Sequence, residues 1–191
     1  MRGDNVVPLL VCTAIAASAL VGGGVASASK TKLAEGPHIP KGGGEVQFTG
    51  YSSGDGPKSV AVLTGAIGDY GDAIRTMSSS SGGSEYNELE LSMTRGSFRL
   101  NVAGIEGELG KAIYGAFPTH SRTCSGEVSV SGTTPIIAGT GTGDYKGLQG
   151  SLHMTITINE VEEWPSCPKT DTSPYLAQSV FITGEGTVSL K

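Results

Sequence analysis

Tyrosines are the residues of this chain best suited to chemistry in an apolar site, since each combines an apolar ring with a hydroxyl that donates a hydrogen bond. Such side chains can hold an apolar molecule and orient it through one or two polar contacts. The tyrosines considered are Tyr51, Tyr70, Tyr86, Tyr114 and Tyr145. We take Tyr51, Tyr70 and Tyr145 as candidate catalytic residues, with core packing as the competing interpretation for each.

The chain lacks the residue patterns of conventional acid-base and nucleophilic catalysis. It contains no Gly-x-Ser-x-Gly nucleophile elbow. His153 lies on the polar phase of a predicted strand, and His120 lies in a predicted loop. Glu88 and Glu90 also fall on the polar phase of their strand, so we interpret them as solvated. A cyclisation can proceed without such groups, because confining a flexible molecule in a reactive conformation lowers the entropic part of the barrier.

Glycine accounts for 30 of the 191 residues, and its densest run extends from Gly139 to Gly150. This run contains neither the dinucleotide fingerprint nor the Gly-Lys-Ser/Thr of a P-loop, and no predicted helix follows it. Nucleotide binding is therefore not expected. Closely spaced glycines let one strand bend sharply into the next, so we expect a barrel corner here. The structural motif comprises Gly139, Gly141, Gly143, Tyr145, Gly147 and Gly150.

The charge of the chain argues against several classes of partner. Its formal net charge is −5, which gives no positive field for nucleic acid. The aspartates form no EF-hand pattern, and the sequence predicts neither a metal nor a cofactor. Regular runs of Val, Ile, Leu and Phe indicate a packed core, although so much Gly and Ser would otherwise suggest disorder.

An uncharged apolar run from Val6 to Val21 precedes the small residues Ala26-Ser27-Ala28. This pattern predicts a secretory signal peptide over residues 1–28, with a retained membrane anchor as the competing interpretation. A bilayer span needs about 20 apolar residues, so we favour cleavage and a secreted protein. Residues 29–44 show no apolar periodicity and predict a flexible leader, followed by one domain over residues 45–191.

Two cysteines, Cys124 and Cys167, remain after the predicted cleavage. Export would place them in an oxidising compartment, so we expect a disulfide between them. Free thiols or a metal site are the alternatives, but the scattered histidines supply no ligand spacing for zinc.

Alternation of apolar and polar residues predicts β-strands throughout the domain, and no stretch shows convincing helical periodicity. Leu89, Leu91 and Met93, for example, share one face of a strand. We predict eight strands, over residues 46–51, 59–67, 86–95, 96–103, 126–131, 134–140, 151–162 and 176–190. Half-buried antiparallel strands of this kind form a sandwich or a closed barrel, and alternation alone does not separate the two.

The glycine run reads Gly-Thr-Gly-Thr-Gly-Asp-Tyr-Lys-Gly-Leu-Gln-Gly, with Ile136-Ile137-Ala138 before it and an alternating strand from Leu152 to Ile158 after it. This stretch resembles the signature shared by allene oxide cyclases and dirigent proteins. With Arg122-Thr123-Cys124, a second cysteine and the Gly-x-Gly-x-Val-Ser ending added to this run, the chain also resembles a group of secreted actinobacterial proteins of uncharacterised function. The resemblance implies an all-β fold, a small eight-stranded antiparallel barrel, with a homo-oligomer as in plant members. It carries over no catalytic residues.

Two functions are compatible with these observations. In the first, the barrel encloses an apolar small molecule and acts without a cofactor as a cyclase or isomerase, by templating an intramolecular cyclisation of the allene oxide cyclase or Diels-Alder type. In the second, the chain is a non-catalytic secreted module for ligand binding or surface interaction, as the similarity to dirigent proteins implies. The space inside the barrel and the polar groups that face it discriminate between the two.

Overall fold

The structure, a computed structural model, describes residues 39–40, 42–54, 56–77, 86–116, 120, 122–164 and 175–191. The predicted signal peptide, most of the predicted leader and Cys167 lie outside these residues. Within the described ranges, no helix has the length and apolar character needed to cross a membrane.

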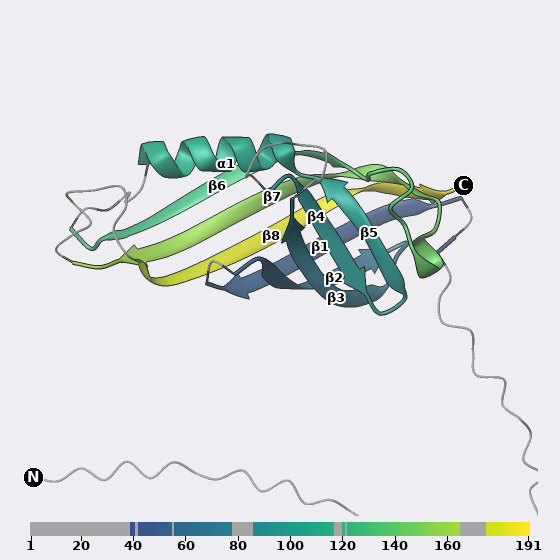
Figure 1. Cartoon of the computed structure of the whole chain (residues 1–191), viewed down its shortest axis with the longest axis horizontal. Helices are drawn as coiled ribbons and strands as arrows, with labels where there is room; N and C mark the ends of the chain where they lie inside the picture. The colour runs from purple at the N-terminus through teal and green to yellow at the C-terminus, as the bar shows by residue number, and fades with distance from the viewer. Residues whose placement is uncertain are drawn as a thin grey trace, which may run out of the picture. The chain divides into compact units, whose positions relative to one another are not determined.

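Eight antiparallel strands form one strongly curled sheet, a half-barrel (Figure 1). The strands are β1 (Gly44–Ser53), β2 (Lys58–Gly65), β3 (Asp69–Thr76), β4 (Glu88–Met93), β5 (Gly96–Asn101), β6 (Ser125–Pro135), β7 (Leu148–Glu162) and β8 (Tyr175–Leu190). Their order across the sheet is β5-β4-β3-β2-β1-β8-β7-β6, so that the first strand pairs with the last. The predicted class, eight antiparallel strands, is confirmed at this level.

The number of strands agrees with the prediction because two errors offset each other. The prediction misses β3, in which Gly71 and Asp72 interrupt the apolar alternation. It also divides β6 into two strands at Gly132, whereas the ladder with β7 continues to Pro135. Proline is tolerated there because β6 is the last strand of the sheet, so its N–H groups have no ladder to complete on the outer side.

A helix, α1 (Ala103–Ala116), lies alongside β6, and the prediction that the chain contains no helix is wrong (Figure 1). Four glycines within 14 residues conceal its periodicity in the sequence. Ile105 and Leu109, spaced one helical turn apart, are buried against the sheet. The side chain of Asn101 accepts a hydrogen bond from the Ala103 N–H at 3.1 Å and helps to begin the helix.

Glycines near the start of β7 and near the end of β8 allow the sheet to curl. A Cβ atom at Gly186 would lie 2.0 Å from the Ser151 carbonyl oxygen, and one at Gly150 would lie 2.1 Å from the Thr187 oxygen. No side chain fits between strands that approach so closely. Gly150 belongs to the glycine run in which a barrel corner is expected, whereas Gly186 lies outside that run.

The glycine run after β6 covers the free edge of β5. The Thr142 N–H donates to the Ser97 carbonyl, and the Thr142 hydroxyl oxygen accepts from the Ser97 N–H, both at 2.8 Å. The Thr140 hydroxyl oxygen accepts from the Arg99 N–H at 3.1 Å. Threonine side chains thus take the place of strand carbonyls along this edge.

The two end strands of the sheet meet through this segment and not through a continuous ladder. In the described residues, the only bridge between them is the isolated pair Leu100 and Ile136, just beyond the end of β6. The predicted closed barrel is therefore observed as a half-barrel whose open side is partly covered by α1 and by the glycine run.

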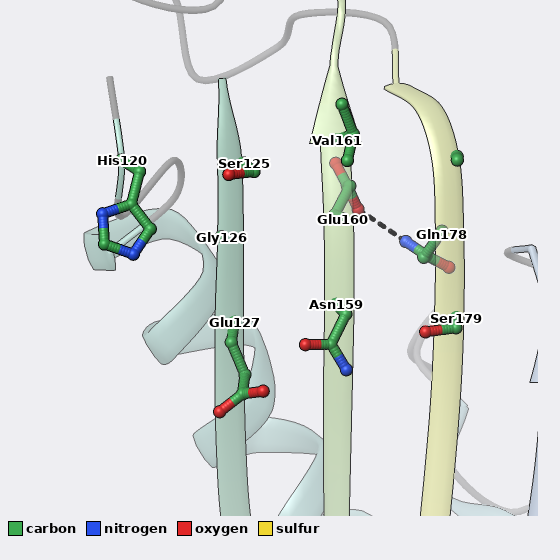
Figure 2. Close-up of a pocket in the computed structure, with 10 residues that line it drawn as sticks. His120, Ser125, Gly126, Glu127, Asn159, Glu160, Val161, Gln178 and Ser179 are labelled. Atoms are coloured by element: carbon green, nitrogen blue, oxygen red, sulfur yellow. Dashed lines mark hydrogen bonds between the residues drawn. The ribbon is translucent and has the colours of Figure 1, made fainter. Parts of the chain in front are cut away.

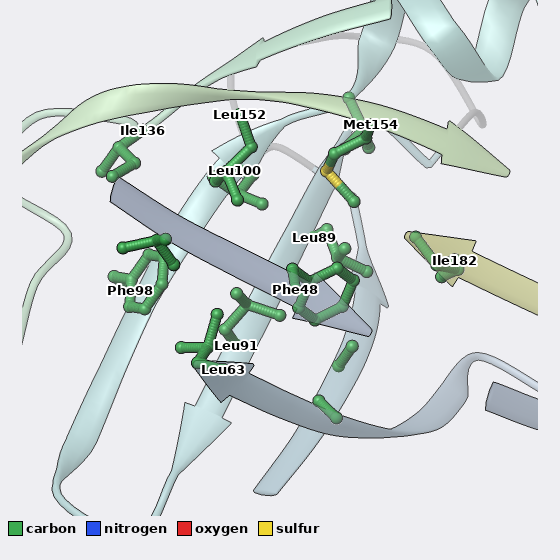
Figure 3. Packing of buried hydrophobic residues seen from close by; sticks show 14 of the residues in the cluster. Phe48, Leu63, Leu89, Leu91, Phe98, Leu100, Ile136, Leu152, Met154 and Ile182 are labelled. Carbon is green, nitrogen blue, oxygen red and sulfur yellow. The ribbon is translucent and has the colours of Figure 1, made fainter. Parts of the chain in front are cut away.

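Apolar side chains fill the concave face of the half-barrel (Figure 3). The largest fully buried rings are those of Tyr145, Phe48 and Phe98. Leu152 and Met154 of β7 lie across the core from the β4 and β5 side chains (Figure 3). Polar side chains are therefore exceptional in this interior.

Candidate functional site

The predicted tyrosines do not gather at one site. Tyr51 and Tyr70 lie on the outer face of the sheet, with 41% and 67% of their surface exposed, whereas Tyr145 is fully buried. Tyr86 is exposed, and the guanidinium of Arg75 stands 4.7 Å from the centre of its ring. The Tyr114 side chain is outside the described part of the structure. Tyr51, Tyr70 and Tyr145 therefore form no joint catalytic group.

Tyr145 holds the glycine run against the rest of the sheet. It ends the short 3₁₀ helix η1 (Gly143–Tyr145), and its hydroxyl donates to an Asp69 carboxylate oxygen at 2.5 Å. Its ring packs against Phe98, with 5.1 Å between ring centroids. Burial and the hydrogen bond to Asp69 raise the pKa of Tyr145, so its hydroxyl stays protonated. This environment favours the packing interpretation of Tyr145.

Asp69 is the centre of this network. The Thr94 hydroxyl donates to Asp69 Oδ1 at 2.5 Å. Arg95 Nε lies 3.4 Å from Asp69 Oδ2, the oxygen that accepts from Tyr145. Burial alone would raise the pKa of Asp69, but hydrogen bonds from Thr94, Tyr145 and the Tyr70 and Arg95 backbone outweigh it and lower the pKa to about 2. The charged carboxylate is thus a structural anchor.

A small cavity lies between the concave face of the sheet and α1. Its volume is about 30 Å³, enough for a water molecule or two and far below the roughly 300–1,000 Å³ of typical ligand sites. Its walls come from six strands and the helix. They comprise Ser52, Gly56, Ser59, Arg75, Leu89, Val102, Glu106, Leu109, Ile156, Ile158, Val180 and Ile182.

One ion pair enters this otherwise mainly apolar cavity. Arg75 Nε of β3 lies 3.3 Å from a Glu106 carboxylate oxygen of α1, and the two side chains are 33% and 15% exposed. Arg75 Nε is buried and makes no hydrogen bond. Burial raises the pKa of Glu106, and the nearby charge of Arg75 counters part of that effect. Among the residues that line the cavity, Arg75 and Glu106 are therefore the charged groups placed to act on a molecule in the interior.

Sequence reasoning missed this pair because Arg75 lies on the strand that was not predicted and Glu106 on the helix that was not predicted. The alternation of Ala73 and Arg75 would have placed the arginine on the inner face had β3 been recognised. The spacing of Ile105 and Leu109 was the corresponding signal for α1.

A shallow depression of about 410 Å³ lies at one end of β6, β7 and β8 (Figure 2). His120 lies beside β6 there, and the Gln178 amide donates to Glu160 at 2.6 Å (Figure 2). In the part of the chain that the structure describes, no three His, Cys, Asp or Glu side chains are grouped to hold a metal. His120 is exposed here and forms an isolated bridge with Ser125, a hydroxyl-bearing residue that lines the same depression.

The remaining residues predicted from the sequence, the glycine motif, Cys124 and two glutamates, have structural positions. Gly139, Gly143, Gly147 and Gly150 adopt positive φ angles of 55° to 136°, which suits glycine. Cys124 is buried with 1% exposure, and its predicted partner Cys167 is outside the described residues, so the disulfide stays a prediction. Glu88 and Glu90 lie on the outer face, as predicted, and both pair with Arg99.

Comparison of the chain with protein-family models, curated proteins and solved structures found no match. The eight-stranded antiparallel curled sheet is the part of the expected resemblance to allene oxide cyclases and dirigent proteins that the structure supports.

Proposed function

We propose that the concave face of the half-barrel binds a small apolar molecule carrying an acidic group, and that α1 closes over it. The observation that carries this proposal is Arg75, a guanidinium in a mainly apolar interior whose buried Nε is ion-paired with Glu106 but has no hydrogen-bond partner among the described residues. A carboxylate or similar oxyanion on the ligand would supply that partner. The surrounding leucine, isoleucine and valine side chains would contact the apolar part.

Glu106 occupies the place that the acidic group of the ligand would take. Its carboxylate reaches Arg75 from α1, with Val102 and Leu109 of the same cavity wall beside it. Because burial already disfavours the charged form of Glu106, a ligand carboxylate competes for Arg75 with a weakened partner. Binding therefore exchanges one carboxylate for another and displaces the helix.

The closed cavity of about 30 Å³ requires such a displacement before a ligand can enter. Three glycines of α1, Gly104, Gly107 and Gly110, face open space, with no atom within 4 Å of an added Cβ. Sterics therefore do not require glycine at these positions, although each costs about 1 kcal/mol of helix stability relative to alanine. A helix weakened in this way opens more readily than the sheet beneath it.

Replacing Gly104, Gly107 and Gly110 together by alanine should raise the free energy of unfolding by about 1.5–3 kcal/mol, since each change contributes roughly 0.5–1 kcal/mol. Urea denaturation followed by circular dichroism measures this effect. The reverse change Ala103→Gly in the same helix is the control and should lower stability. The proposal also requires slower ligand release in the triple variant, so unchanged release with raised stability would count against α1 as the closing element.

Dodecanoate and dodecanol are suitable probes, because they share an apolar chain and differ in charge. Wild-type protein should bind dodecanoate more tightly, and Arg75→Met should weaken dodecanoate at least 10-fold while changing dodecanol little. Glu106→Gln should tighten dodecanoate several-fold, because it removes the competing carboxylate. Isothermal titration calorimetry measures these affinities. Arg99→Met, on the outer face, is the matched control, and equal losses in both arginine variants would rule out the assigned role.

Catalysis of a cyclisation or isomerisation is the second candidate, and the Arg75–Glu106 pair favours it. A fixed guanidinium stabilises negative charge that develops on a substrate oxygen, and a carboxyl with a raised pKa can donate a proton. The substrate would be an unsaturated epoxide or polyene that rearranges without gaining or losing atoms. Incubation with a fatty acid allylic epoxide, with Arg75→Met as the inactive comparison, tests this; absence of turnover in wild-type protein leaves the binding module.

Secretion, the Cys124–Cys167 disulfide and membership of the allene oxide cyclase and dirigent group complete the proposal. The export signal places the domain outside the cell, where a disulfide would pin the segment that follows β7. Free-thiol titration of the unfolded, unreduced secreted protein should give zero. Two thiols per chain would contradict the disulfide.

A further inference from the structure

The outer face of the sheet carries a continuous polar groove over β7, β8, β1 and β2. Two adjoining hollows of about 340 and 570 Å³ share the residues Gln47, His153 and Glu185. These three side chains form one row across neighbouring strands, because His153 pairs with Glu185 and Glu185 pairs with Gln47. The groove is independent of the interior cavity, which lies on the opposite face.

Hydroxyl groups line the next row of this face. Thr155 pairs with Thr183, and Thr183 pairs with Thr49, so threonines from three strands lie side by side. The Ser131 hydroxyl extends the row onto β6 and is 2.8 Å from the Thr155 hydroxyl. Side chains two residues apart on a strand face are about 7 Å apart, which sets the distance between this row and the first.

Two exposed aromatic rings begin a third row. Tyr51 and Phe181 are paired across β1 and β8, with 5.0 Å between ring centroids and 54° between ring planes. They are 41% and 47% exposed. An aromatic pair open to solvent beside a groove indicates a surface that contacts something apolar on one side and polar on the other.

The charges of the groove select the occupant. Its walls contain the carboxylates of Glu45 and Glu185 and no Lys or Arg. Among the described residues, neither carboxylate has a hydrogen bond or an ion pair. Such a surface offers hydrogen-bond acceptors and repels phosphates, acidic polymers and anionic membranes. A second copy docked on this face about a twofold axis would place four of these carboxylates in one interface.

We propose that this outer face binds a neutral polysaccharide. Sugar hydroxyls donate to Glu45, Glu185 and Gln47 and exchange hydrogen bonds with the threonine row, while the apolar face of a sugar ring stacks on Tyr51 and Phe181. A chain of several sugars runs along the strands from the groove, past the threonine row, to the aromatic pair. The neutral, donor-rich surface of the polymer complements the acceptors that the groove presents.

Depletion of the purified full chain from solution by cellulose, chitin or starch granules tests the proposal, with alginate beads and anionic phospholipid vesicles as further arms. Wild-type protein should bind at least one neutral polysaccharide, and the double variant Tyr51→Ala/Phe181→Ala should bind it at least 10-fold more weakly. Glu185→Gln should weaken it several-fold. Leu176→Ala, which alters another exposed apolar residue of β8, is the matched control and should stay within twofold of wild type.

Several outcomes would overturn the proposal. These are no retention on any neutral polysaccharide, retention on alginate or vesicles alone, or equal retention of the aromatic double variant. A double variant that changes only the oligomeric state, measured by light scattering, would assign the face to a second copy instead. Since the substituted side chains are exposed, circular dichroism should show an unchanged fold. If the double variant is unfolded, Glu185→Gln decides the test, and retention equal to that of wild type overturns the proposal.

Discussion

Alanine at position 186 should destabilise the domain by more than about 4 kcal/mol, the largest effect expected of any single substitution considered for this chain. The added Cβ would lie 2.0 Å from the Ser151 carbonyl oxygen and 2.8 Å from the Leu152 Cα. Both are backbone atoms of β7, so no side chain can rotate away to make room. Relief requires β7 and β8 to separate where the sheet bends, which breaks hydrogen bonds of the ladder.

Urea denaturation and soluble yield measure the effect of Gly186→Ala. Two further glycines calibrate it. Gly184→Ala, whose Cβ would lie 3.1 Å from the flexible Met154 side chain, should cost much less, and Gly107→Ala, which faces open space, should stabilise. If Gly186→Ala unfolded at the same urea concentration as wild type, the close approach of β7 and β8 would be wrong.

Replacing Asp69 by alanine should lower the free energy of unfolding by about 3–5 kcal/mol, since it removes the partner of several buried groups at once. The Tyr145 and Thr94 hydroxyls and the Arg95 guanidinium would lose the carboxylate. Tyr145→Phe removes one hydrogen bond and keeps the ring packing, so it should cost about 1–2 kcal/mol. Asp72→Ala, on the same strand and paired at the surface with Lys58, is the matched control and should cost about 1 kcal/mol or less.

The pH dependence of the free energy of unfolding is a second measurement of the Asp69 network. The pKa of Asp69 is lowered from 3.8 to about 2 on folding, so its stabilising contribution is fully present above pH 3.8 and is lost as the pH falls toward 2. This linkage corresponds to about 2 kcal/mol. Wild-type stability should therefore fall more steeply over that interval than that of Asp69→Ala. Parallel curves for the two proteins would contradict the assigned role of Asp69.

Much of the strand content could be predicted from the sequence, because half-buried strands impose a period of two. Leu89, Leu91 and Met93 alternate in this way and are all buried. β3 escaped prediction because its inner face carries Asp69, Gly71 and Arg75, which serve the network, the bend and the cavity in place of apolar packing. Residues with such special tasks break the alternation that reveals ordinary strands.

The helix and the interior site were not predictable for a related reason. Gly104, Gly107 and Gly110 lower the helix propensity of α1, and tertiary packing of Ile105 and Leu109 overrides that propensity. The spacing of Ile105 and Leu109 covers a single helical turn, too short a signal to outweigh these glycines in the sequence. The interior pair of a β3 arginine and an α1 glutamate depends on how the sheet curls, which sequence separation does not reveal.

Glycine has two different structural roles in this chain, and the composition does not distinguish them. At Gly186 and Gly150 the neighbouring backbone leaves no room for a side chain, whereas at Gly104 and Gly107 the space is open. The first group shapes the half-barrel. The second, by our proposal, makes its cover easy to open.

Nuclear magnetic resonance of the full chain during titration with dodecanoate tests the interior site most directly, through the Arg75 Nε–Hε signal and the backbone amides of α1. The account predicts a saturable shift of the Arg75 signal, accompanied by shifts along α1 from Ile105 to Leu109, and loss of both in Arg75→Met. Shifts confined to the outer face around Tyr51 and Phe181, or an Arg75 signal that stays in place at saturation, would contradict it.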